Sequence, residues 1–323
     1  MEKINGPLGV PICIFIFLRE KQTLELIDTI RKVKPSKLYI VGEGHRPDRI
    51  GEKEKVLELR RKVENAIDWP CEVYKNYVPE DIGAGKRIYS GIDWVFAQEE
   101  ECIFLEDDIR PSVSFFYFCE ELLLRYKKDT RIGLITGFNP LGTYCFDGNS
   151  YGFSHCGSIY GWASWRDRWK KYDWEMKALD NDTSMLVAQM TAEKPNLAKR
   201  RVKKWKKTKL LISNGSISTW DYQWDITRRS NNWLDIVPAV SLTENCGVDE
   251  FARSGPVQFK LMPKRIQRIF LVRKQEIEFP LKHPEYFLRS NKYDDKYMGY
   301  LLPNRFVTAG DVFIKKIKLL LLR

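Results

Sequence analysis

Three consecutive carboxylates follow a short apolar run in the first third of the chain. The run from Cys102 to Leu105 has the composition of a buried parallel strand, and Glu106, Asp107 and Asp108 come directly after it. In an open α/β sheet, ligands bind where the strands deliver their carboxyl ends. Carboxylate oxygens suit Mg²⁺ and Mn²⁺, which complete their coordination shells with water and substrate phosphates. The stretch therefore predicts a metal-diphosphate site, and the alternative is a solvated acidic turn before Pro111.

The chain as a whole has the composition of a folded globular protein. Of its 323 residues, 43% are hydrophobic and 30% are charged, so it can bury a core as one large domain or two small ones. Its 7 cysteines contain no C-x-x-C pair and its 3 histidines are scattered, which predicts reduced thiols, a cytoplasmic protein and no histidine-rich metal site. The net charge of +11 indicates anionic partners such as phosphates, acidic lipid or nucleic acid.

The apolar segment from Val10 to Leu18 is best interpreted as a first strand. It lacks the small-residue cleavage site of a signal peptide and runs directly into Arg19 and Glu20. No stretch approaches the roughly 20 apolar residues that span a bilayer, so we expect no membrane-spanning helix.

Strand and helix patterns then alternate about every 30 residues through the first half of the chain, which is the spacing of βα units. The pattern predicts an α/β fold with a doubly wound, mostly parallel central sheet and helices on both faces. The predicted strands are Ile12–Phe17, Leu38–Val41, Cys71–Tyr74, Cys102–Leu105 and Ile132–Thr136, and the predicted helices are Lys21–Val33, Glu52–Ile67, Gly85–Gln98 and Ser112–Tyr126.

The pattern changes after residue 140, where Gly, Ser, Tyr and Trp replace the regular alternation. Glycine and aromatic residues at this density favour a loop- and helix-rich half that holds a second substrate. We therefore expect a donor-binding half at 1–140, an acceptor and catalytic-base half of the same domain at 141–255, and a basic C-terminal extension at 256–323.

Two basic segments each allow two interpretations. The segment Lys199–Lys209 carries eight Lys or Arg residues around Val202 and Trp205, and it is either a solvated helix face or a contact for phosphate groups. The segment Phe313–Arg323 predicts a short amphipathic helix, which either packs on the domain or lies on an anionic membrane surface.

The acidic triplet, with Pro111-Ser112 and Phe115-Phe116 after it, resembles the nucleotide-sugar glycosyltransferases of the GT-A fold. Among these enzymes, the chain is most similar to the N-acetylglucosaminyltransferase that initiates complex N-glycans and to its bacterial relatives, over most of residues 10–250. The resemblance implies a metal-dependent hexosyl- or N-acetylhexosaminyltransferase with a UDP-sugar as the favoured donor. From the basic character of the chain and its C-terminal segment, we expect a membrane-proximal glycan or lipid-linked glycan acceptor, a place in cell-surface polysaccharide synthesis, and peripheral contact with the inner face of the plasma membrane.

The resemblance assigns roles to several residues near the donor. Asp108 is the acid that meets Mn²⁺ or Mg²⁺, while Glu106 and Asp107 contact hydroxyls of the ribose and the donor sugar. Arg19 stands where the family places an arginine against the nucleotide phosphates, a contact that a guanidinium fork suits. Glu43 matches the acid that accepts from the nucleotide base, although the family more often has aspartate there.

Further matches lie on a helix start and on two tryptophan-rich stretches. Gly83, Lys86 and Arg87 belong to the segment that opens a helix near the donor, where amides and basic side chains favour anions. The stretches around Trp162 and around Trp220 resemble the family's acceptor wall and its catalytic-base loop. The acceptor-binding residues that the resemblance implies are Trp162, Trp165 and Trp220.

A carboxylate in the second stretch is expected to act as general base. Removing the proton of an acceptor hydroxyl as the new bond forms contributes on the order of 10²–10⁴ in rate. Asp221 is the first candidate, and Asp225 is the reserve because it lies one helical turn further along. A single base that acts by direct displacement predicts inversion at the anomeric carbon.

Two competing functions remain open at the level of sequence. A sugar-1-phosphate nucleotidyltransferase has a related fold, but it usually carries a glycine-rich loop after the first strand, where this chain has Phe17-Leu18-Arg19-Glu20. A non-catalytic protein could instead bind nucleic acid or anionic lipid through Lys199–Lys209, and steep salt dependence without metal would identify a nucleic-acid binder. We expect the glycosyltransferase, with nucleic acid not a partner.

Overall fold

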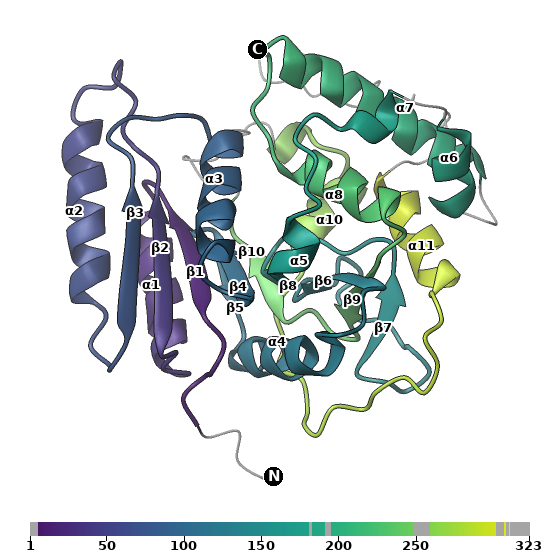
Figure 1. Ribbon diagram of the computed structural model, residues 1–323, viewed down its shortest axis with the longest axis horizontal. Coiled ribbons are helices and arrows are strands. Elements are labelled where there is room, and N and C mark those ends of the chain that lie inside the picture. The colour runs from purple at the N-terminus through teal and green to yellow at the C-terminus, as the bar shows by residue number, and fades with distance from the viewer. Residues whose placement is uncertain are drawn as a thin grey trace.

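The fold is built on an eight-stranded sheet with helices on both faces (Figure 1). The computed structural model describes residues 6–180, 183–190, 195–247, 259–301, 307 and 310. The strand order is β3-β2-β1-β4-β8-β6-β9-β7. All strands run parallel except β8, between β4 and β6, and β7 at one edge. The predicted α/β class is confirmed. The helix predicted at Phe313–Arg323 lies outside the described residues.

The donor half follows the predicted alternation closely. Its elements are β1 (Ile12–Ile16), α1 (Glu20–Arg31), β2 (Lys37–Gly42), α2 (Glu52–Asn65), β3 (Glu72–Tyr77), α3 (Ala84–Phe96), β4 (Glu101–Glu106), β5 (Ile109–Pro111), α4 (Val113–Tyr126) and β6 (Ile132–Thr136). Each strand and helix predicted there is present. Burial on both faces gives β1, β4 and β6 a nearly continuous apolar sequence, whereas β3 is a partly exposed edge strand with polar residues.

The second half adds strands to the same sheet. Its elements are β7 (Tyr151–Ser154), β8 (Trp162–Trp165), α5 (Arg166–Trp169), η1 (Lys177–Leu179), α6 (Ser184–Met190), α7 (Pro195–Ser213), α8 (Asp221–Ser230), β9 (Leu234–Pro238), β10 (Thr243–Asn245), α10 (Lys264–Phe270) and α11 (Asn291–Leu301). The sequence did not predict β7, β8 and β9, which are all short; β7 and β8 are also rich in aromatic or small residues. The sheet therefore continues through the region that we expected to be mostly loops and helices.

Each face of the sheet has its own buried core. Side chains alternate along β1, so that Ile14 joins the layer beneath α1, α2 and α4, whereas Phe15 joins the layer beneath α3 and α8. In α3, Ile88, Ile92 and Val95 recur at helical spacing and face the second layer. Because the two layers hold β1 and β4 from both sides, the turns that follow these strands stand on a rigid support.

After β10, the part of the chain that the structure describes packs against α4 and against residues near β7 and β9. The carboxylate of Glu276 accepts from the backbone N–H groups of Val113 and Ser114 at 3.2 and 2.8 Å, which caps the amino end of α4. Farther on, Tyr293 and Met298 of α11 are buried against residues near β7 and β9. No helix in the described ranges is both long and apolar enough to cross a membrane.

Candidate active site

Three parallel strands deliver the predicted donor residues to one edge of the sheet. In the register of β1, Phe15 pairs with Glu106 of β4 and Ile16 pairs with Gly42 of β2. Arg19, Glu43 and the acidic triplet follow these paired ends directly. The structure thus brings together residues that are far apart in the sequence, at the edge where α/β sheets bind ligands.

Asp107 joins the ends of β1 and β4. Its Oδ2 accepts from the backbone N–H of Phe17 at 3.1 Å, and its Oδ1 accepts from Nη1 of Arg19 at 2.8 Å. The side chain is only 6% exposed. Both carboxylate oxygens are therefore engaged within the protein, and one of them holds the Arg19 guanidinium at the sheet edge.

Asp108 lies between β4 and the small sheet that β5 forms with β10. Its backbone carbonyl accepts from the N–H of Cys246 at 2.8 Å, and its Oδ2 lies 3.6 Å from Nη1 of Arg19. A Cβ at Gly247 would collide with Oδ2 of Asp108, so the absence of a side chain at Gly247 leaves this carboxylate room. At 18% exposure the Asp108 side chain remains accessible.

Glu106 closes β4 among other acids. Burial raises the pKa of its carboxyl well above the ordinary range, and the negative charges of Asp108, Asp107 and Asp221 raise it further. The charge of Arg19 acts in the opposite direction. A site with this many carboxylates and one nearby guanidinium favours an added cation.

A stack of aromatic rings connects β4 to α8. The ring of Phe104 on β4 lies 4.6 Å from that of Trp162 on β8, and the Trp162 ring lies 5.7 Å from that of Trp220. Trp220 immediately precedes α8, whose first residue is Asp221. Trp162 and Trp220 therefore act as a packed support that places Asp221 opposite the acidic triplet.

Burial and a hydrogen bond have opposite effects on Asp221. Burial raises the pKa of its carboxyl, while the hydrogen bond donated by the hydroxyl of Thr219 lowers it. The loop itself is fixed, since the hydroxyl of Tyr172 donates to the carbonyl of Trp220 at 2.9 Å. Asp221 is thus a half-buried, oriented carboxylate within electrostatic reach of Glu106.

Glu43 holds a buried oxygen at the end of β2. Its Oε1 accepts from the N–H groups of Gly44 and Ile82 at 3.0 and 3.3 Å, but its Oε2 is buried without a hydrogen-bond partner. Burial raises the pKa of this carboxyl. A buried oxygen without a hydrogen-bond partner costs free energy, which points to a ligand that donates a hydrogen bond to it.

Arg87 and Lys86 differ in their surroundings. The guanidinium of Arg87 is buried and donates to the carbonyls of Gly42 and Asn76, which braces the strand end that carries Glu43. Lys86 is exposed at the start of α3. The residue before the helix, Gly83, adopts the left-handed conformation at φ +88°, and its N–H donates to Asp81.

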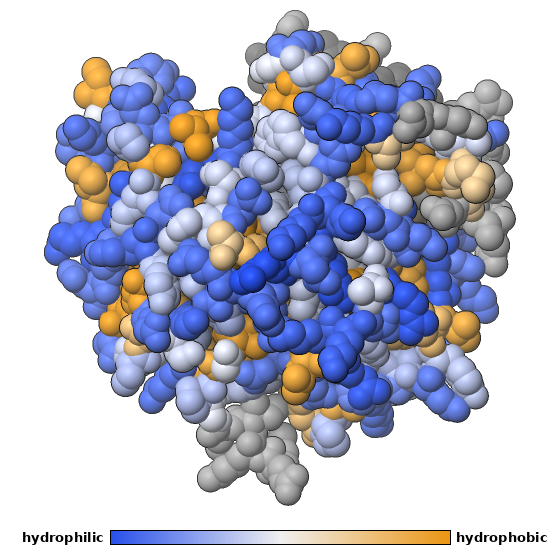
Figure 2. Space-filling model, viewed as in Figure 1, coloured by the Kyte–Doolittle hydropathy of each residue, from blue (hydrophilic) through white to orange (hydrophobic). Residues whose placement is uncertain are grey.

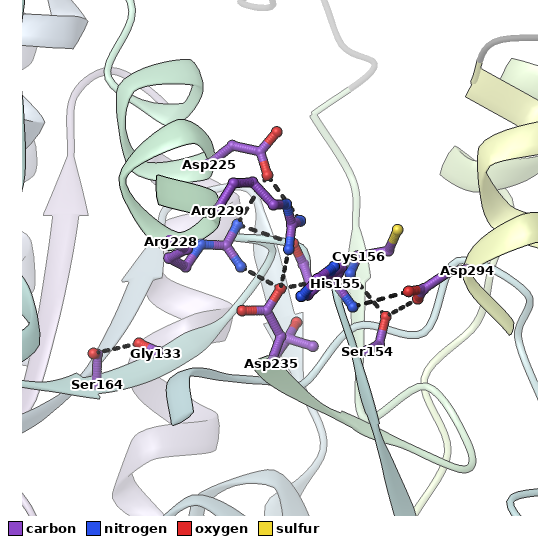
Figure 3. A network of polar contacts seen from close by, with 12 residues as sticks. Gly133, Ser154, His155, Cys156, Ser164, Asp225, Arg228, Arg229, Asp235 and Asp294 are labelled. Atoms are coloured by element: carbon purple, nitrogen blue, oxygen red, sulfur yellow. Dashed lines mark hydrogen bonds and ion pairs between the residues drawn. The ribbon is translucent and has the colours of Figure 1, made fainter. Parts of the chain in front are cut away.

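Two predicted residues lie away from this edge. Trp165 points to the opposite face of the sheet from Trp162, where its Nε1 donates to the carbonyl of Leu123 at 3.2 Å in the core. Asp225 points into a cluster of buried arginines (Figure 3). Its carboxylate accepts from Arg201 at 2.6 Å, and nearby arginines lower its pKa far below that of Asp221.

The arginine cluster anchors α8 to the sheet. Arg228 and Arg229 are at most 2% exposed and lie between Asp225 on α8 and Asp235 on β9 (Figure 3). Asp235 also accepts from the N–H of Gly157 at 2.7 Å. The position of Asp221 at the start of the same helix therefore depends on a buried ionic network at its other end.

Two residues of the site were not predicted. Thr219 orients Asp221, and its position two residues before a helix start was a signal that the sequence offered. Tyr160 is partly buried beside the site and experiences the charge of Asp108 together with those of Asp221 and Glu106. Nothing in the sequence around Tyr160 distinguishes it from a core tyrosine.

The carboxylates at this sheet edge suit a metal ion that takes few protein ligands. Within the described ranges, no group of three or more His, Cys, Asp or Glu side chains is arranged to hold a metal ion. Mg²⁺ and Mn²⁺ need only one or two protein carboxylates when substrate phosphates and water complete the shell. Asp108, whose side chain is 18% exposed, fits this requirement.

Comparison with known proteins gives this chain no family. No protein-family model matches it, and no curated protein matches it. Among solved structures, it is similar to the mannosyltransferase PcManGT from Pyrobaculum calidifontis, solved in complex with GDP-Man and Mn²⁺, with a TM-score of 0.34 and 11% identity. The match covers 50% of this chain and 46% of that chain. A likeness this weak carries no argument about function, which rests on the site itself.

Proposed function

We propose that the chain is a metal-dependent glycosyltransferase that uses a nucleoside diphosphate sugar as donor. The observation that carries this proposal is the convergence of Arg19, Asp108 and the half-buried carboxylate of Asp221 at one edge of the sheet. A cation-seeking acidic turn beside an arginine suits a diphosphate. A separate, half-buried carboxylate suits proton removal from an incoming hydroxyl.

Donor binding would use three groups of the strand ends. The guanidinium of Arg19, which Asp107 holds in place, contacts the diphosphate. The buried Oε2 of Glu43 accepts from the nucleotide base. Asp108 would hold the divalent ion, which supplies charge neutralisation for the departing diphosphate. Uridine is the base that we favour, on the resemblance described above.

Transfer would use Asp221. An oxygen of the acceptor hydroxyl forms a bond to the anomeric carbon while the bond from that carbon to the diphosphate breaks, and the hydroxyl proton passes to the Asp221 carboxylate. The pKa of Asp221, raised by burial, makes it a stronger base than an exposed aspartate. Attack from the side opposite the diphosphate gives inversion. The acceptor that we favour is a glycan or lipid-linked glycan.

A thermal-shift experiment tests this proposal. We expect a nucleoside diphosphate together with Mn²⁺ to raise the melting temperature, and either one alone to leave it nearly unchanged. A panel of nucleoside diphosphates with different bases identifies the base from which Glu43 accepts a hydrogen bond. The Asp108→Ala variant should lose the shift, whereas Asp68→Ala, at an exposed position beyond α2, should keep it. The proposal is wrong if no nucleoside diphosphate stabilises the protein in the presence of Mn²⁺.

A further inference from the structure

The helix α7 carries a concentration of positive charge that the proposed catalytic site does not use. From Pro195 to Trp220 the sequence contains no Asp or Glu, although eight Lys or Arg residues lie between Lys199 and Lys209. Such a run raises a strong local positive potential, because no acid of its own segment offsets it.

The two sides of α7 have different surroundings. Val202, Trp205 and Thr208 are buried on the side that faces the domain. Lys199, Lys203 and Lys206 are exposed. Their spacing of four and then three residues places these lysines in one row along the solvent side.

Only part of the charge of α7 is neutralised within the protein. Arg201 is paired with the half-buried Asp225, and Lys209 contacts Asp180 at 2.6 Å. Within the described part of the chain, no ion pair involves Lys199, Lys203 or Lys206. The outer row therefore remains available to an external anionic surface.

An apolar side chain continues the row of lysines. Leu210 lies four residues after Lys206 on the same side of the helix and is 67% exposed. Met185 on α6, the helix that contacts α7, is 73% exposed. Figure 2 shows hydrophobic residues among the hydrophilic ones at the edge of the molecule that α6 and α7 form. Lysines with interspersed exposed aliphatic residues are typical of helices that lie on lipid headgroups.

The position of α7 relates this surface to the sheet edge. The helix lies at the end of the molecule toward which β1, β2 and β3 run, beyond α8 (Figure 1). The loop 214–220 leads from its end to Asp221, and Ser218 in that loop accepts from the N–H of Gly85. A surface bound to α7 would therefore lie on the same side of the molecule as the candidate active site.

We propose that the exposed row of α7, formed by Lys199, Lys203, Lys206 and Leu210, docks the protein on an anionic lipid surface. The row is lysine rather than arginine, which suits diffuse attraction to headgroup phosphates more than bidentate recognition of single groups. The exposed Leu210 gains by entering the headgroup region, whereas a polynucleotide backbone offers it no apolar partner. This docking does not depend on the proposed enzymatic activity.

Vesicle co-sedimentation of the full chain tests the surface directly. We expect binding to vesicles that contain phosphatidylglycerol in phosphatidylcholine, weakening with salt, and little binding to phosphatidylcholine alone. The variant Lys199→Gln/Lys203→Gln/Lys206→Gln should weaken binding about a hundredfold, at roughly fivefold for each lysine near the surface. The matched control Lys53→Gln/Lys55→Gln/Lys128→Gln removes the same charge from exposed positions elsewhere and should retain binding.

A second variant separates lipid from nucleic acid. Leu210→Ser keeps the charge and should lower vesicle affinity several-fold, with no change in the affinity for a duplex DNA probe at the same salt concentration. Equal losses in the α7 and control lysine variants would show attraction by net charge alone and overturn the proposal. It would also be overturned if the α7 variant kept full vesicle binding, or if duplex DNA bound more tightly than the vesicles.

Discussion

At the scale of single residues, two aspartates on one helix have opposite environments. Asp221 is half-buried, accepts a hydrogen bond from a threonine hydroxyl, and has a raised pKa. Asp225, four residues on, is surrounded by arginines that lower its pKa. Environments that separate two carboxylates in this way assign them different roles. Asp221 is suited to accept a proton, whereas Asp225 is suited to hold the helix.

Substitution of Asp221 tests its role as base. Asp221→Asn keeps the size of the side chain and its polar contacts, so binding of the nucleoside diphosphate with Mn²⁺ should be unchanged in calorimetry. Transfer should fall at least a hundredfold, because the amide cannot take the acceptor proton. Turnover close to that of the unsubstituted protein would show that another group is the base.

The sequence could name Asp221 but could not describe its surroundings. The acidic triplet and Trp220-Asp221 are local patterns that the chain displays openly. The two oxygens of Asp107 accept from partners 90 and 88 residues away, and the contact of Asp225 with Arg201 joins residues 24 apart. The spacing of residues along the sequence does not reveal such pairs. For this reason the sequence predicted that Asp107 contacts the donor and that Asp225 is a reserve base.

At the scale of elements, the start of α3 supports the loop that precedes α8. A Cβ at Gly85 would lie 2.5 Å from the backbone nitrogen of Thr219 and 2.8 Å from its carbonyl oxygen. The N–H of Gly85 also donates to the hydroxyl of Ser218 at 3.1 Å. The contact joins the donor half to the residue that orients Asp221.

Gly85→Ala should therefore disturb the candidate site through the backbone. The added methyl must push the 218–219 segment away, so transfer should fall tenfold or more and the melting temperature should drop. Gly299→Ala is the control, since a Cβ there meets nothing within 4 Å and alanine favours the helix that holds it. Equal activity of the two variants in a transfer assay would show that this contact does not position Asp221.

The ionic network that anchors α8 predicts a stability effect. Asp225→Asn leaves Arg201, Arg228 and Arg229 buried without their shared carboxylate, which should cost about 3 kcal/mol of unfolding free energy in denaturant titrations. Asp180→Asn removes an exposed partner of Lys209 and should cost less than about 1 kcal/mol. Similar losses in both variants would contradict the importance of the buried network.

The same residue gives a dependence on pH. Because the folded pKa of Asp225 is lowered, its stabilisation is complete above the ordinary aspartate range and is lost as the pH falls toward the folded pKa. The unsubstituted protein should therefore lose stability on acidification below about pH 4. Asp225→Asn should show a shallower loss over that interval, measured by the same titrations.

At the scale of the whole molecule, one mixed sheet joins both halves. The alternation of the first half predicted its parallel strands, because strands buried on both faces carry unbroken apolar runs. The insertion of β8 between β4 and β6 was not predictable, since its four residues resemble a tryptophan-rich loop and its partners lie far apart in the sequence. This insertion brings Trp162 next to Phe104 and so places α8 opposite the acidic turn.

We propose that Asp108 is the protein ligand of a divalent ion at this sheet edge, and that a nucleoside diphosphate binds the same ion. Titration with Mn²⁺, followed by electron paramagnetic resonance of the free ion, measures the affinity of the protein for Mn²⁺ in the presence and absence of UDP. We expect weak Mn²⁺ binding alone, binding at least tenfold tighter with UDP, and loss of that enhancement in Asp108→Asn. Mn²⁺ affinity that is unaffected by UDP, or unchanged in Asp108→Asn, would contradict it.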